Sequence, residues 1–463
     1  MKMYNSLKEI QNKLYNKNLQ MEEIVKFYLG KIYKHNKEIN AFLEIFEEEA
    51  LEKSKIIQKK ILEKKAGKLA GLVVGIKDNI CYKDHKLSAS SKILENFTSL
   101  FSATVVERML KEDAIIIGRL NCDEFAMGSS NENSAFGNVK NPLDKTRVTG
   151  GSSGGSVAAV SANMCMIALG SDTGGSVRQP ASFCNLFGLK TTYGRVSRHG
   201  LIAYASSFDQ ISPMTKNIED AALVLEVISG KDNFDATVSS EIVPNYYKEI
   251  KNLDFSKKKL KIAYLKETIE HNGLDKEIKN KILNIIKDLK NLGHNLKDIE
   301  FPYLDYLVPT YYVLTAYRSI KKTKNLKDNI IKSRSEAFGK EVKRRIMTGT
   351  FVLSAGYYDA YYSKAQKVRR LIYNKTIDIF KDYDFIILPT TATTAFKFGE
   401  KGENPISMYL EDLFTVHANL AGIPAISVPV GKHSNGMPFG IQIYAPHFHE
   451  SKMMAFANYL NNL

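Results

Sequence analysis

The chain has 463 residues, of which 44% are hydrophobic and 25% are charged, as in an ordinary soluble globular protein. This composition excludes wholesale disorder and low-complexity architecture, and the length is typical of one large domain or two to three smaller ones. Lys and Arg total 65 against 50 Asp and Glu, a formal charge of +15. Such a balance is compatible with a nucleic-acid partner, but lysines alternate with glutamates along segments such as 51–65, which favours solvated helix faces.

Membrane, export and disulfide signals are weak. No uninterrupted apolar run approaches the roughly 18 residues of a membrane span, because the best candidate, 157–169, is interrupted by Ser161 and Asn163. The first residues lack the apolar stretch of a signal peptide, so we expect a cytoplasmic protein without membrane contact. The cysteines are Cys81, Cys122, Cys165 and Cys184. They form no C-x-x-C pair, so we expect reduced thiols rather than a zinc ribbon.

Residues 1–68 are predicted to form a helical segment packed on the core of the protein. Ser6 followed by Glu9 has the spacing of a capping box, and apolar residues recur at helical spacing from Leu7 to Ile32. We place the main domain at 69–463.

Strand and helix signals alternate after residue 69. A short apolar run ends at Lys77 and predicts a buried strand that delivers a polar loop. The next predicted elements are a helix over 104–111, a strand over 114–118, a helix over 156–163 and a strand over 165–169. This alternation predicts an α/β fold whose sheet is buried on both faces.

Residues 230–380 differ in character and predict a helical, basic insertion or cap. The predicted elements here are a strand over 257–265, a charged amphipathic helix over 274–292 and a tyrosine-rich helical stretch over 328–381. Sheet signals return at 385–388, 425–428 and 440–444, and a terminal helix begins at 450.

Two Gly/Ser-rich runs, TGGSSGGS at 149–156 and GSDTGGS at 170–176, flank an apolar stretch of helix and strand length. A flexible linker would not contain an apolar stretch long enough for a buried helix and strand. A phosphate-binding loop is not indicated either, because the Lys of its motif is missing. The remaining interpretation is a serine hydrolase. Glycines let backbone N–H groups approach an oxyanion without a Cβ in the way, and Ser176 supplies a hydroxyl beside such groups.

A competing serine is Ser153, since residues 151–155 match the G-x-S-x-G nucleophile elbow of α/β-hydrolases. That fold also needs an acid and a downstream His, and no histidine of the chain stands in a telling context. His447 and His449 lack the spacing and partners of a metal site, so we expect no metal in this chain.

The two runs and Lys77 resemble the amidase signature family, whose members use a Ser–cis-Ser–Lys triad without His. Lys77 lies 75 residues before Ser152, which lies 24 before Ser176. The resemblance covers nearly the whole chain and implies an α/β fold with a central mixed, twisted sheet covered by helices on both faces. It implies that Ser176 is the nucleophile, that Ser152 follows a cis peptide and relays the proton, and that Lys77 is the base. The oxyanion is then expected on the N–H groups of Thr173, Gly174, Gly175 and Ser176.

Within that family the chain is similar to the A subunits of tRNA-dependent amidotransferases. The matching strings are GIKDNI at 75–80, DEFAMGSSNENSAFG at 123–137 and, most specifically, 333–369. The similarity implies a glutaminase that supplies ammonia for converting Glu-tRNA(Gln) to Gln-tRNA(Gln), or Asp-tRNA(Asn) to Asn-tRNA(Asn). It also implies a heterotrimer with B and C subunits, in which the B subunit uses ATP and Mg²⁺ while this chain holds no cofactor.

Free glutamine carries a carboxylate and an ammonium, so its pocket needs a fixed cation and a fixed anion. Matching the pattern of these A subunits places the cation on Arg345, with Arg344 as its rival, and the anion on Asp412. The remaining lining residues are expected to be Ser129 and Tyr311 or Tyr312. The stretch 315–325 departs from the family pattern.

Two alternatives stay open at this stage. The first is a stand-alone amidase of the same family. The second is a catalytically silent scaffold or RNA-binding protein of a complex, which the +15 charge suggests.

Overall fold

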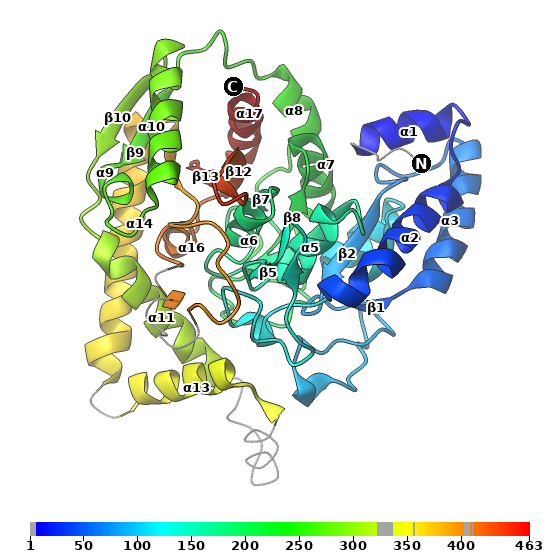
Figure 1. The fold of residues 1–463 in the computed structure, drawn as a ribbon, viewed down its shortest axis with the longest axis horizontal. Helices are drawn as coiled ribbons and strands as arrows, with labels where there is room; N and C mark the ends of the chain where they lie inside the picture. Colours follow the sequence, from blue (N-terminus) through cyan, green and yellow to red (C-terminus); the bar gives the residue numbers. More distant parts are fainter. Residues whose placement is uncertain (1–5, 322–336, 355–356, 402–407, 410) are drawn as a thin grey trace.

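The computed structural model describes residues 6–321, 337–354, 357–401, 408–409 and 411–463 (Figure 1). Within these residues eleven strands form one mixed sheet. They are β1 (Phe42–Ile45), β2 (Val73–Lys77), β3 (Ile115–Leu120), β6 (Ile167–Asp172), β7 (Phe187–Lys190), β8 (Gln210–Thr215), β9 (Lys261–Leu265), β10 (Asn295–Ile299), β11 (Phe385–Pro389), β12 (Ala425–Lys432) and β13 (Pro438–Tyr444). Their order across the sheet is β1-β3-β2-β6-β8-β7-β12-β13-β11-β9-β10. A separate two-stranded ladder joins β4 (Lys140–Asn141) to β5 (Asp144–Val148).

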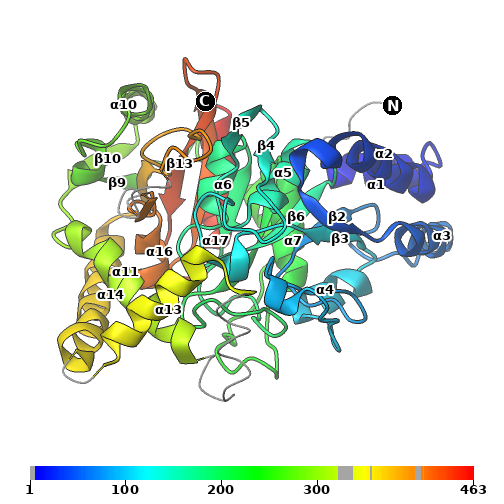
Figure 2. The same cartoon turned by 60° about the horizontal axis from the view of Figure 1, so that its bottom comes forward.

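Helices pack on both faces of the large sheet, so the predicted α/β architecture is confirmed (Figures 1 and 2). They are α1 (Leu7–Tyr15), α2 (Met21–Ile39), α3 (Glu47–Leu62), α4 (Thr104–Lys111), α5 (Gly154–Ser161), α6 (Arg178–Phe183), α7 (Ile218–Ile228), α8 (Tyr246–Asn252), α9 (Lys266–Ile269), α10 (Lys276–Asn291), α11 (Leu304–Lys321), α13 (Lys340–Val352), α14 (Lys364–Asp382), α16 (Val416–Ala421) and α17 (Glu450–Asn461). Short helical turns occupy 92–94, 124–126 and 358–363.

The elements around the two Gly/Ser-rich runs agree well with the sequence. The predicted strand that ends at Lys77 is β2, the helix over 104–111 is α4, and the strand expected at 165–169 is β6, displaced by two residues. Strand β2 lies parallel to both β3 and β6, in the middle of one half of the sheet, and all of its residues are buried. This position explains its continuous apolar run.

Two expectations from the sequence need correction. Residues 42–45 form the edge strand β1, where a continuous helical segment was predicted, because Phe42 and Ile45 pair with residues of β3. The region 230–380 is also more than a cap, since β9 and β10 extend the central sheet beyond β11. Its helices α11, α13 and α14 lie together at one side of the molecule (Figure 2). The division of the chain at residue 68 stays a prediction.

The N-terminal helices share the main core of the protein. Ser6 Oγ accepts the N–H of Glu9 at 3.2 Å and caps α1, whose buried face carries Leu7, Ile10 and Leu14. These side chains belong to the same apolar cluster as the strands of the large sheet. The first helices are therefore held to the sheet by shared apolar packing.

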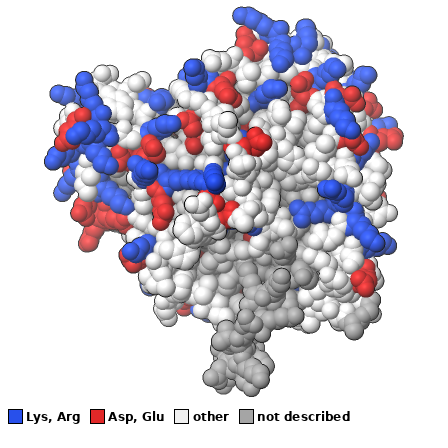
Figure 3. Space-filling model, turned by 180° about the vertical axis from the view of Figure 1, so that it is seen from behind, with Lys and Arg blue, Asp and Glu red and all other residues white. Residues whose placement is uncertain are grey.

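The surface seen from behind shows lysines and arginines interspersed with acidic side chains (Figure 3). This mixture agrees with solvated faces as the reason for much of the positive charge. In the described part of the chain, no helix combines the length and apolar character needed to cross a bilayer. The four cysteines are described, buried and unbonded to one another, as expected for reduced thiols.

Candidate active site

Three separate segments of the chain meet at the carboxyl ends of β2 and β6. These strands are parallel neighbours, with Ile76 paired to Leu169, so Lys77 at the end of β2 lies beside the end of β6. Ser152 lies just before α5, and Ser176 lies between β6 and α6. The fold thus brings both Gly/Ser-rich runs to the lysine.

Lys77 is fully buried and surrounded by hydroxyl groups. Its Nζ lies 2.7 Å from Ser152 Oγ, 2.9 Å from Ser171 Oγ and 3.0 Å from Ser153 Oγ. Burial lowers the pKa of Lys77 to about 8, because the charged amine loses its hydration. A substantial uncharged fraction is therefore present slightly above neutral pH, as a general base requires.

Ser152 is also fully buried, and the Gly151–Ser152 peptide bond is cis, as the family resemblance implied. The N–H of Gly151 donates to Gln179 Oε1 at 3.0 Å, and the N–H of Asp123 donates to the Ser152 carbonyl oxygen at 3.1 Å. Ser152 is therefore held from both sides while its hydroxyl faces Lys77.

Ser176 is partly exposed, unlike Lys77 and Ser152. Its carbonyl oxygen accepts the N–H of Ser153 at 3.3 Å, which ties the two Gly/Ser-rich runs together. Within the described residues, the Ser176 hydroxyl has no hydrogen bond, and none joins it to Ser152. Ser176 is thus the most accessible member of the predicted triad, as expected of the residue that attacks a substrate.

The predicted oxyanion loop is packed tightly. A Cβ on Gly174 would come within 2.4 Å of the Tyr311 hydroxyl, and one on Gly175 within 2.3 Å of Thr415 Oγ1. Gly175 also has a φ of +130°, which side-chain-bearing residues rarely adopt. Its N–H donates to Asp172 Oδ1 at 2.9 Å, so this one of the four predicted oxyanion donors is already engaged.

A buried ion pair holds the predicted oxyanion loop in place. Arg178 and Asp172 are both fully buried and 3.1 Å apart. Burial alone would raise the pKa of Asp172, but the adjacent guanidinium lowers it to about 2, so this carboxylate stays charged. Arg178 also donates to the Thr415 carbonyl oxygen and to Asn419 Oδ1, which connects the loop to α16.

The residues predicted to bind glutamine lie together next to this loop. Asp412 Oδ1 accepts the hydroxyl of Ser129 at 2.9 Å, and Oδ2 accepts the hydroxyl of Tyr312 at 2.6 Å. Burial raises the pKa of Asp412 to about 6, which leaves it anionic at neutral pH. Tyr311 is buried against Gly174. The structure thus brings these side chains together, whereas the sequence left open which tyrosine lines the pocket.

The structure also distinguishes between the two candidate arginines, which are neighbours on α13. The Arg345 side chain is buried, and its Nε donates to Glu341 at 2.8 Å while Nη1 donates to the hydroxyl of Tyr204 at 2.6 Å. Its guanidinium lies over the rings of Tyr204 and Tyr312, at 5.3 and 5.2 Å from their centroids. The Arg344 side chain is 40% exposed and pairs with the same Glu341 from outside.

Several residues at this site carried no signal of their own in the sequence. Tyr204 and Glu341 hold Arg345, and Gln179 links Gly151 to the Ser129 carbonyl oxygen at 2.7 Å. Ser171 contacts Lys77, although the sequence marks it only as part of a Gly/Ser-rich run. Residues 333–336 and 355–356 of the most specific matching string, and residues 322–325 of the divergent stretch 315–325, lie outside the described residues.

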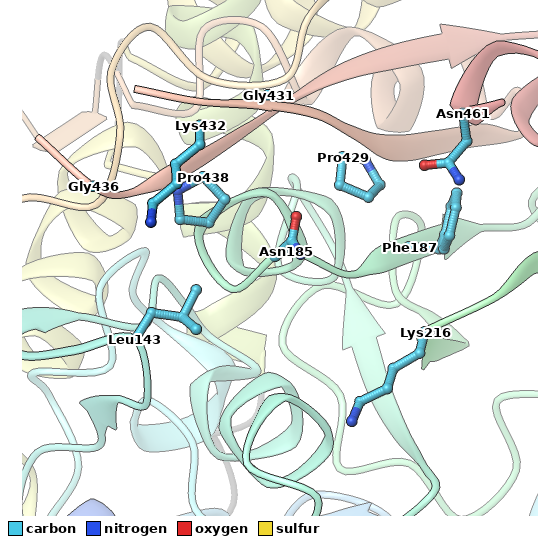
Figure 4. A pocket seen from close by; sticks show the side chains of 10 residues that line it. All are labelled: Leu143, Asn185, Phe187, Lys216, Pro429, Gly431, Lys432, Gly436, Pro438 and Asn461. Carbon is cyan, nitrogen blue, oxygen red and sulfur yellow. The ribbon is translucent and has the colours of Figure 1, made fainter. Parts of the chain in front are cut away.

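A large surface cavity lies away from the triad. It has a volume of about 570 Å³ and lies between the β12–β13 hairpin and β7, with Phe187, Lys216 and Lys432 among its lining residues (Figure 4). None of the predicted site residues lines it. In the described ranges, no group of three or more His, Cys, Asp or Glu side chains is arranged to hold a metal ion.

Comparison with known proteins places these features in context. A family model described as Amidase matches residues 23–454. The A subunit of glutamyl-tRNA(Gln) amidotransferase from Oceanobacillus iheyensis is 47% identical over 462 residues, covering 96% of this chain and 93% of the relative. The protein of the same name from Chlorobium phaeobacteroides is 46% identical over 473 residues, covering 98% of each chain. The crystal structure of the A subunit of glutamyl-tRNA(Gln) amidotransferase from Thermotoga maritima matches with a TM-score of 0.80 and 41% identity, covering 95% of this chain and 93% of that one.

Proposed function

This chain belongs to the amidase family, and from that premise we propose that it is the A subunit of a tRNA-dependent amidotransferase, the glutaminase part of a ligase complex. In this role it hydrolyses glutamine and supplies ammonia for converting Glu-tRNA(Gln) to Gln-tRNA(Gln). The observation that carries the proposal is the buried amine of Lys77, 2.7 Å from the hydroxyl of Ser152, beside the loop that bears Ser176.

The chemistry begins with attack of Ser176 Oγ on the side-chain carboxamide carbon of glutamine. The Ser176 proton passes to Ser152, whose own proton passes to the uncharged amine of Lys77. The C–N bond then breaks, and the proton held by Lys77 returns through Ser152 to the departing nitrogen, which leaves as ammonia. The product is a γ-glutamyl ester on Ser176.

Water completes the cycle by attacking the ester carbonyl. It gives up its proton along the same route, and the Ser176 oxygen recovers a proton as it leaves, so the products are glutamate and the free enzyme. In both steps negative charge develops on the carbonyl oxygen. We assign its stabilisation to the backbone N–H groups of Thr173, Gly174 and Ser176, because the N–H of Gly175 is donated to Asp172.

The pocket next to the loop suits free glutamine. With Nε and Nη1 of Arg345 engaged by Glu341 and Tyr204, the guanidinium is held rigidly and its remaining N–H groups suit the α-carboxylate of the substrate. Asp412 is the anion for the α-ammonium, and Ser129 and Tyr311 complete the lining.

Ammonia is useful only if it reaches an acceptor, so the proposal includes partners. We place B and C subunits beside this chain in the cytoplasm, with ATP, Mg²⁺ and the misacylated tRNA bound by the B subunit. The second acceptor to be examined is Asp-tRNA(Asn).

The coupling of hydrolysis to tRNA tests this function. The assembled enzyme is expected to release glutamate from glutamine faster when ATP and Glu-tRNA(Gln) are added, and to form Gln-tRNA(Gln) in step with that release. Glutamate and aminoacyl-tRNA are measured in the same reaction, and a parallel reaction with Asp-tRNA(Asn) defines the acceptor.

The alternatives give different results in that assay. A stand-alone amidase would hydrolyse glutamine at one rate with or without partners, ATP and tRNA. A catalytically silent scaffold would release no glutamate at all. The close contact between Lys77 and Ser152 favours an active enzyme over the silent scaffold.

A further inference from the structure

The amine of Lys77 has two hydroxyl neighbours that the proton relay through Ser152 does not use. Ser153 Oγ lies 3.0 Å from Nζ and Ser171 Oγ lies 2.9 Å from it. All three serines are buried, the least so being Ser171, which is 2% exposed. Burying a polar side chain costs free energy unless it forms a hydrogen bond. We therefore ask which hydrogen bonds these serines form with the amine.

Which hydrogen bonds form depends on the hydrogen-bonding capacity of the amine. A lysine ammonium has three N–H donors and no acceptor, whereas the uncharged amine has two N–H donors and one lone pair. Three hydroxyls around Nζ therefore match both states. If two of them accept N–H groups, the lone pair of the uncharged amine faces the third.

The surroundings of Ser153 favour the accepting role, and Ser171 already accepts a hydrogen bond from another side chain. The single hydroxyl hydrogen of Ser153 is directed to the Ser171 carbonyl oxygen at 3.2 Å, which leaves Ser153 Oγ to accept from Lys77. Ser171 Oγ is anchored by the side-chain amide of Asn79 at 3.0 Å. Once Lys77 carries the proton, its nitrogen has no lone pair, so both hydroxyl oxygens then accept N–H groups from it.

We propose that Ser153 and Ser171 are positioning residues that direct the lone pair of Lys77 toward Ser152 and hold the ammonium that forms when the proton arrives. This assignment rests on the proposed glutaminase function and adds two residues to its machinery. Asn79 supports it by fixing Ser171.

Other titratable groups face Lys77 and can affect the pH profile. They are Cys122, Asp123, Asp172 and Asp209. Burial raises the pKa of Cys122 to about 12 and that of Asp123 to about 6, while Asp172 is kept charged by Arg178. Burial also lowers the pKa of Lys190, which interacts with Asp172, to about 7. The shift of the pH profile on replacing a serine that contacts Lys77 is therefore the measurement that reports on Lys77.

The test is the pH dependence of glutamine hydrolysis by the assembled enzyme. Because the uncharged amine is the active form, wild-type kcat/KM is expected to rise with pH through about 8. In Ser171→Ala and Ser153→Ala the ammonium loses one charge-assisted acceptor, which favours the uncharged amine. The rise of kcat/KM in these variants should then occur at lower pH than in the wild type, by on the order of one pH unit.

The maximal rate of both variants is expected to fall. With one acceptor missing, the lone pair is no longer fixed on Ser152, so kcat at the plateau should fall by about tenfold. KM for glutamine should stay near the wild-type value, because neither serine contacts Arg345 or Asp412. A variant whose structure is merely loosened is not expected to combine a lower kcat at the plateau with a rise of kcat/KM at lower pH.

Ser156→Ala is the matched control. Ser156 is a buried serine of α5 whose hydroxyl donates to the Leu169 carbonyl oxygen at 3.2 Å and does not contact Lys77. Its pH profile should coincide with that of the wild type. The inference is wrong if Ser171→Ala and Ser153→Ala keep the wild-type pH profile, or if Ser156→Ala shifts as they do. A wild-type enzyme that releases no glutamate would instead overturn the proposed function itself.

Discussion

Replacing Ser176 by Ala is expected to abolish glutamine-dependent formation of Gln-tRNA(Gln) while ammonia-dependent formation stays close to that of the wild type. Loss of the nucleophile should lower the glutamine-dependent rate by at least about a thousandfold. The fold should be unaffected, because within the described residues the Ser176 hydroxyl makes no hydrogen bond. Ammonia added to the solution bypasses the missing step. The two rates are measured on the assembled enzyme, with glutamine or an ammonium salt as the nitrogen donor.

Ser182→Ala is a matched control for this variant. Ser182 lies on the adjacent helix α6, is buried, and its hydroxyl has no hydrogen-bond partner in the part of the chain that the structure describes. It should retain both activities. If Ser176→Ala loses the ammonia-dependent activity together with the glutamine-dependent one, Ser176 has a structural role and the assignment is wrong.

Arg345→Ala is expected to raise KM for glutamine by about 100-fold with little change in the ammonia-dependent rate. Removing one partner of a buried, hydrogen-bonded charge pair typically costs about 2–5 kcal/mol, and 100-fold corresponds to about 2.7 kcal/mol. Arg345→Lys should fall between Ala and the wild type, because it keeps the charge and loses the planar fork. Initial rates over a range of glutamine concentrations give these values.

The neighbouring Arg344 offers a close control. Both arginines pair with Glu341, at 2.8 Å from Arg345 and 2.7 Å from Arg344, so both Ala variants lose one contact to the same carboxylate. Only Arg345 reaches Tyr204 in the buried pocket. KM in Arg344→Ala should therefore stay near the wild-type value. An equal rise in both variants would show that the effect comes from Glu341 and α13, not from binding of the substrate carboxylate.

The parts of the site that the sequence predicted are those with strong local signals. Strand β2 is a continuous apolar run that ends in a polar residue, and the two Gly/Ser-rich runs stand out against the rest of the chain. Once β2 and β6 are placed side by side as parallel strands, the positions of Lys77 and of both runs follow, because carboxyl ends of parallel strands share one edge of the sheet.

What the sequence did not predict depends on contacts between distant segments. Strand β1 has only four residues and lies between two helices, so its pairing with β3 leaves almost no periodic signal. Tyr204 reaches Arg345 across 141 positions, and nothing in its local pattern marks it. The sequence motif marks Ser153 only as a possible nucleophile, while in the structure its hydroxyl oxygen lies 3.0 Å from Lys77 Nζ as an acceptor.

The central claim, that Ser176 is the nucleophile served by Lys77 through Ser152, is tested most directly by mass spectrometry. The assembled enzyme is treated with a glutamine analogue whose carboxamide is replaced by an electrophilic diazoketone, and the modified peptide is identified. The account predicts a single adduct on Ser176 that is absent in Ser176→Ala and strongly reduced in Lys77→Met. An adduct on Ser153 or on a cysteine, in an enzyme that still hydrolyses glutamine, would contradict it.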